Sequence, residues 1–174
     1  MATPMRRFQR RAPAKARTYI PVSGDVSVGT ASLADNAQAA IVDSALANPT
    51  TSQAYGRGVL GGLRVNVSLY PAADTKIMPE VFVLILPLGL AVPSLLTPAL
   101  IKANERFVWL RGQFRCSMAL SATAATYTFE AAPKTKRRFE MNDRLVVVIL
   151  NQTGVAFGAG SNATSVIDVF ATED

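Results

Sequence analysis

Alternation of apolar and polar residues is the main pattern along this chain. Residues 63–70, LRVNVSLY, place leucine or valine at every odd position and a polar or aromatic residue at every even one. A period of two is typical of a β-strand with one buried face. Similar patterning predicts further strands at residues 19–28, 106–116, 126–131 and 164–171.

Two other segments are apolar at both odd and even positions. They are residues 80–88, EVFVLILPL, and residues 144–151, RLVVVILN. Strands of this kind need cover on both faces. Residues 134–141, KTKRRFEM, complete a set of eight strands, and we expect Asn142-Asp143 to form a hairpin turn into residues 144–151.

The region 29–62 has the weakest strand pattern. Within it, residues 36–47, NAQAAIVDSALA, are rich in alanine, which favours a short helix capped by Asp35 or Asn36. We expect the rest of this region to form a surface loop and not a second domain.

Eight short strands with few helices predict an all-β sandwich or barrel. Eight antiparallel strands in two sheets form a jelly roll, so we expect an eight-stranded antiparallel jelly-roll sandwich. A length of 174 residues fits one such domain, at residues 18–174, preceded by a short N-terminal segment.

The segment 89–103 contains two prolines typical of a loop, yet it is rich in large apolar residues. Loops normally run over the surface, so this segment predicts either a contact patch between subunits or a lid over the chain's own core. A tryptophan in the strand that follows is also an interface or core candidate, and beside arginines it could stack on bases. The candidate interface residues are Leu95, Leu96, Leu100, Ile101 and Trp109.

Positive charge is concentrated at the start of the chain. The sequence has 18 Lys plus Arg and 12 Asp plus Glu, for a net charge of +6. Residues 1–17 hold an excess of six cations and no acid, so the charges of residues 18–174 cancel. The six cations of this basic N-terminal arm are Arg6, Arg7, Arg10, Arg11, Lys15 and Arg17. The arm lacks a helix or strand period, and we expect it to be flexible.

A flexible cationic arm is typical of a segment that binds a polyanion, most simply a nucleic acid. A nuclear-localisation signal, a solubilising tail and a transit peptide are alternatives, although an arm without serine is unlike a transit peptide. A second basic cluster consists of Lys134, Lys136, Arg137 and Arg138. It is a further candidate for binding nucleic acid, with an import signal, a receptor patch or a solvated strand as alternatives.

The chain contains no histidine. This excludes Ser-His-Asp and Cys-His catalysis and His-ligated zinc, so we expect a protein that is not an enzyme and has no cofactor or metal. One cysteine, Cys116, excludes an internal disulfide and favours a reducing compartment. No apolar run reaches about 18 residues and none follows the basic start, so we expect neither membrane insertion nor a secretory signal.

Three features together resemble the single-jelly-roll capsid (coat) proteins of small icosahedral viruses. They are the basic arm, the strand LRVNVSLYP followed by EVFVLILPL, and the stretch PKTKRRFEMNDRLVVVILN. The similarity is greatest to the capsid proteins of circular, Rep-encoding single-stranded DNA viruses, the circovirus relatives. It implies a virion protein of which about 60 copies self-assemble into a shell. It also implies arms that face inward on a packaged genome, DNA more than RNA, with assembly in the host nucleus as an option.

Two other functions stay open. A cellular nucleic-acid-binding β protein, such as a ribosomal component, would normally carry basic residues over its folded surface as well. A lectin-like jelly-roll oligomer would bind sugars or receptors, but we expect neither a secretory signal nor cysteine pairs in this chain.

Overall fold

Most of the residues that the structure describes belong to β-strands. The computed structural model describes residues 18–26, 33–46, 57–69, 79–119, 125–131, 136–140, 142–154, 156–157 and 163–173. In these residues the strands are β1 (Thr18–Val26), β2 (Ala37–Ala45), β3 (Arg57–Leu69), β4 (Glu80–Pro87), β5 (Val108–Gln113), β6 (Arg115–Ala119), β7 (Ala125–Ala131), β8 (Arg137–Glu140), β9 (Asp143–Asn151) and β10 (Ala163–Glu173). A short helix, α1 (Pro98–Ala103), and a 3-10 turn, η1 (Glu105–Phe107), lie between β4 and β5.

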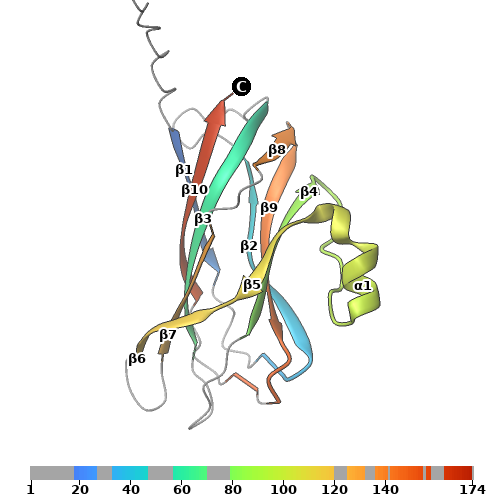
Figure 1. The fold of residues 1–174 in the computed structure, drawn as a ribbon, viewed down its shortest axis with the longest axis vertical. Helices are drawn as coiled ribbons and strands as arrows, with labels where there is room; N and C mark the ends of the chain where they lie inside the picture. Colours follow the sequence, from blue (N-terminus) through green and yellow to red (C-terminus); the bar gives the residue numbers. More distant parts are fainter. Residues whose placement is uncertain are drawn as a thin grey trace, which may run out of the picture.

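The strands form two sheets that face each other (Figure 1). Sheet A has the order β1-β10-β3-β7-β6, with β8 also paired to β3, and sheet B has the order β2-β9-β4-β5. Every pairing between the described strands is antiparallel. The prediction of an all-β, antiparallel, sandwich-like body is therefore confirmed, but the described residues form ten strands and not the eight expected.

The predicted helix at residues 36–47 is wrong, because most of this segment is strand β2, paired with β9. A register shift between Ala40 and Val42 lets the neighbouring residues Ile41 and Val42 both be fully buried. The burial of two β-branched side chains against β9 outweighs the modest helix preference of the alanines.

The predicted hairpin at Asn142-Asp143 is also wrong, although the turn itself is present. Asn142 has a φ of 80°, as expected of a tight turn. However, β8 pairs with β3 in sheet A, whereas β9 pairs with β2 and β4 in sheet B. The turn therefore carries the chain from one sheet to the other.

A second crossing divides the strand predicted at residues 106–116. It becomes β5 in sheet B and β6 in sheet A, separated by Phe114, whose side chain is fully buried. The Phe114 N–H donates to the Pro79 carbonyl at 3.2 Å. Near this crossing, a Cβ on Gly112 would lie 2.6 Å from Cε2 of Phe129, so only glycine fits without displacing the ring.

The apolar side chains form two clusters. The larger cluster fills the space between the sheets and includes Val83, Val147 and, from sheet A, Leu63. The second joins Phe82 and Val148 of sheet B to Leu95 in the segment before α1, with other apolar residues of β4 and β9. The prediction that residues 80–88 and 144–151 need cover on both faces is thus confirmed for residues 81–86 and 145–150, all of which are buried.

Candidate nucleic-acid interface

The predicted basic sites fall into two groups. All six arm cations and Lys134 lie outside the described residues. The first described residue is Thr18, where β1 begins at one edge of sheet A. The remaining three candidates, Lys136, Arg137 and Arg138, lie at or in β8.

Strand β8 divides its side chains between two faces. Phe139 is 1% exposed and belongs to the core between the sheets, and Arg137, two residues earlier, shares its face. Lys136, Arg138 and Glu140 alternate with them and are exposed on the outer face of sheet A. Burial of Phe139 thus decides which basic residues of the cluster reach solvent.

Arg137 contacts the chain itself. It lies opposite Leu60 in the pairing of β8 with β3, and its Nη2 donates to the carbonyl of Arg106 at 2.7 Å. The Arg106 guanidinium lies 4.5 Å from the centre of the Phe107 ring. Arg137 therefore links β8 of sheet A to η1, the turn that precedes β5 of sheet B. The sequence pattern did not identify Arg106 as its partner, because the two residues are 31 positions apart.

The apolar segment 89–103 covers the outer face of sheet B, with α1 beside β4 and β5 (Figure 1). It begins with Gly89 in a turn, at a φ of 88°, closed by a 3.2 Å bond from the Leu90 N–H to the Pro87 carbonyl. Leu95 is fully buried, and Leu96 and Ile101 are half-buried against the same cluster. Within one chain, this segment is therefore a lid.

Three polar side chains, in or next to strands of sheet B, hold the lid. Gln38 accepts from the Leu95 N–H at 2.6 Å and donates to the Pro93 carbonyl at 2.9 Å. Gln152, just after β9, donates to the Leu96 carbonyl at 2.9 Å. Arg144 donates to the Leu90 carbonyl and also pairs with Asp43. The pattern along the chain did not single out these residues, because their partners are more than 50 positions away.

The five candidate interface residues differ in how much surface they present. Leu95 has none left for a partner in this conformation, and Leu100 is 38% exposed. Trp109 is half-buried against the core between the sheets, in agreement with the core alternative. Its Nε1 is buried and has no hydrogen-bond partner in the described part of the chain. Contact of these residues with another subunit stays a prediction.

A cavity of about 420 Å³ lies where β5 crosses to β6. Gln113, Arg115 and Glu130 contribute its polar lining, and Glu130 is already paired with Arg64 at 2.9 Å. No group of three or more cysteine, aspartate or glutamate residues gathers to hold a metal ion within the described residues.

The sequence matches no model of a known protein family, and no curated protein sequence shows significant similarity to it. Among the described residues, no helix has the length and apolar character needed to cross a membrane.

Proposed function

We propose that the two-sheet body is a jelly roll. The support is the nesting of its strand pairs: β1 pairs with β10, β2 with β9, β3 with β7, and β4 with β5. The first half of the chain thus pairs with the second half in reverse order, as expected of one long antiparallel ribbon rolled into two sheets. Jelly rolls occur in viral capsids, lectins and cupins.

We propose further that the protein is a viral capsid protein, which self-assembles into an icosahedral shell and packages the genome through its basic arm. The observation that carries this proposal is the separation of charge between residues 1–17 and a body whose charges cancel. Neutral bodies can pack side by side without long-range repulsion, while the arms neutralise phosphates.

Ion pairs within the body agree with this division. Arg64 pairs with Glu130 at 2.9 Å, Arg111 pairs with Glu80 at 2.7 Å, and Arg144 pairs with Asp43. Each pair joins a cation of the body to an acid of the body. The described part of the body thus uses several of its arginines internally, and the arm is left as the main carrier of positive charge.

On this proposal, the shell contains about 60 copies and belongs to the virion, with the host nucleus as a possible place of assembly. The cargo is single-stranded DNA in preference to RNA, and the protein has no enzymatic role. The exposed apolar residues near the lid, Leu88 at 62%, Leu90 at 40% and Leu100 at 38%, are the candidates for contact between copies.

A truncated chain beginning at Thr18, compared with the full chain, tests the proposal. We expect closed particles from both in light scattering and negative-stain microscopy, with co-purified nucleic acid only in the full chain. Truncation should make the slope of log affinity against log salt for single-stranded DNA shallower by about 4, because each of the six cations contributes about 0.7. A full-length variant with glutamine at all six cationic positions of the arm separates the effect of charge from that of length.

Two outcomes would contradict the proposal. A truncated chain that binds nucleic acid as tightly as the full chain would exclude the arm as the packaging element. A full chain that remains monomeric while binding nucleic acid would instead favour a cellular nucleic-acid-binding protein.

A further inference from the structure

The register of sheet A places the second basic cluster near the residue where the arm begins. Thr18 lies opposite Ala171, Ala171 lies opposite Leu60, and Leu60 lies opposite Arg137. These four residues form one row across four strands. Since neighbouring strands are about 4.8 Å apart, the Cα atoms of Thr18 and Arg137 are about 14 Å apart. Figure 1 shows the start of β1, the end of β10 and β8 at the same end of the molecule.

Cationic residues outnumber acids in β8 and the described residues that flank it. Arg57 lies opposite Glu140 in the pairing of β3 with β8, and Glu173 lies opposite Gly58 in the pairing with β10. In β8 and these flanking residues, the three cations Lys136, Arg137 and Arg138 stand against two acids, Glu140 and Asp143; Oδ2 of Asp143 accepts from the Glu140 N–H at 2.8 Å. No ion pair joins Lys136 or Arg138 to an acid within the described residues. Other arginines of the body do have such partners.

We propose that Lys136 and Arg138 form a second contact for the nucleic acid that the arm binds, an inference that rests on the proposed function of the arm. The two residues are exposed on the same face of sheet A, about 6.6 Å apart along the chain. An arginine fork can bind a phosphate through two hydrogen bonds, and a lysine supplies a compact charge. Arg137 is not part of this contact, because its guanidinium donates to the Arg106 carbonyl.

The contact has a consequence for the position of the nucleic acid. The arm is a tether, so a strand bound to it is held at high local concentration near the end of sheet A. Lys136 and Arg138 then bind in an effectively intramolecular step and fix where the strand lies on the folded body. A sulfated polysaccharide would also be attracted by these charges. We favour nucleic acid over sulfated polysaccharide, because the row of paired residues places β8 near the start of β1, where the arm that binds nucleic acid is attached.

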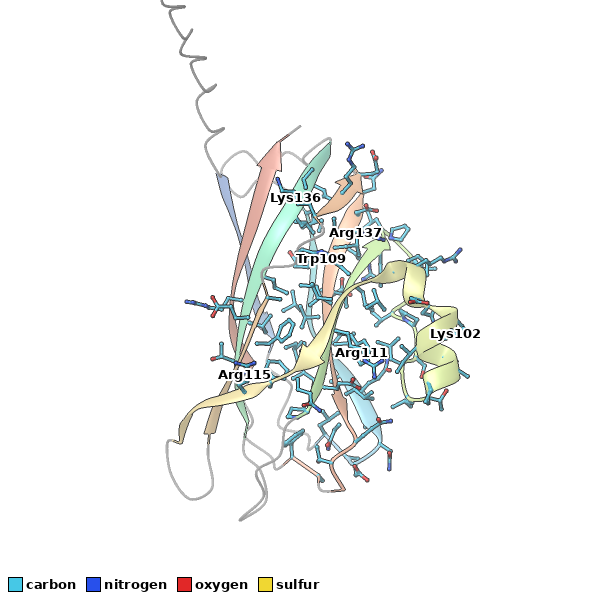
Figure 2. All side chains as sticks on the ribbon, viewed as in Figure 1. Lys102, Trp109, Arg111, Arg115, Lys136 and Arg137 are labelled. Atoms are coloured by element: carbon cyan, nitrogen blue, oxygen red, sulfur yellow. The ribbon has the colours of Figure 1, made fainter. Side chains whose placement is uncertain are left out.

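The test uses the full-length protein and a labelled single-stranded DNA, with binding followed by fluorescence anisotropy over a range of salt concentrations. The variant Lys136→Gln, Arg138→Gln should reduce the slope of log affinity against log salt by about 1.4. The matched control, Lys102→Gln, Arg115→Gln, removes two exposed charges from α1 and β6, away from β8 (Figure 2). In this control, the slope of log affinity against log salt should change by less than half as much as in the β8 variant. The charge-retaining variant Lys136→Arg, Arg138→Lys should keep the original slope.

The outcomes separate this inference from the proposed function. If the β8 variant matches its control while truncation at Thr18 abolishes binding, the inference is overturned and the arm retains its role. If truncation leaves binding unchanged, the proposed function itself fails. If the β8 variant loses binding to heparin but keeps the original slope with DNA, the surface recognises sulfated polysaccharide and the inference is overturned. Urea unfolding at an unchanged midpoint confirms that each variant is folded.

Discussion

The outer faces of the two sheets are built in different ways. In sheet B, Phe82 and Val148 are fully buried under the lid, and Gln38 and Gln152 hold the lid backbone. In sheet A, the outer face at β8 presents exposed charged residues, among them Arg138. The difference indicates that the outer face of sheet B adds packing to the body, whereas the outer face of sheet A at β8 leaves its charges exposed to solvent.

The largest expected effect lies under the lid, at Leu95. Replacing Leu95 with alanine should lower the free energy of unfolding by about 3 kcal/mol, because the side chain is fully buried and its removal leaves a cavity. Urea denaturation with an unchanged m-value measures this loss. The control, Leu100→Ala, changes a residue that is 38% exposed and should cost less than about 1 kcal/mol. Equal costs would show that the lid does not pack on sheet B as described.

A smaller effect is expected from the hydrogen bonds that hold the lid. Gln38→Ala removes the acceptor of the Leu95 N–H and the donor to the Pro93 carbonyl, and should cost about 2 kcal/mol. Faster hydrogen exchange of the Leu95 amide should accompany the loss. Gln152→Ala removes a single, more exposed bond and should cost about 0.5 kcal/mol. Unchanged exchange at Leu95 in the Gln38 variant would mean that the lid is held by packing alone.

The smallest effect is expected on the outer face of sheet A. A double-mutant cycle on Arg64 and Glu130, whose side chains are 48% and 62% exposed, should give a coupling of about 0.5 kcal/mol. This coupling should disappear near 1 M salt, where screening is strong. A coupling of about 2 kcal/mol that persists in salt would contradict this prediction, because it would mean that the exposed ion pair stabilises the fold strongly.

Local patterns predicted the strands best where one face or both faces are apolar. The alternation at Leu63 and Val65, with Arg64 exposed between them, agrees with the structure. The prediction at residues 36–47 failed because alanine is compatible with both helix and strand, and the decision came from pairing with β9. At Asn142 the pattern predicted the turn but not the sheet to which the next strand belongs.

For the basic cluster, too, the sequence shows which residues are present but not how they are arranged. Its residues are evident from the sequence, but their separation into an exposed pair and a bonded Arg137 depends on the burial of Phe139. Likewise, the apolar character of segment 89–103 is evident, whereas its place on sheet B follows from hydrogen bonds to Gln38 and Gln152. These contacts join residues that are distant along the chain, so no local pattern encodes them.

The sequence by itself determined the β-rich character of the body and the separation of charge between residues 1–17 and the rest, because periodicity and composition are local properties. Only the tertiary structure decided which strands are neighbours and which end of sheet A carries β8. Strand order depends on pairing energy summed over long-range partners, and many orders are compatible with the same alternation. The row from Thr18 to Arg137 therefore exists only in the folded chain.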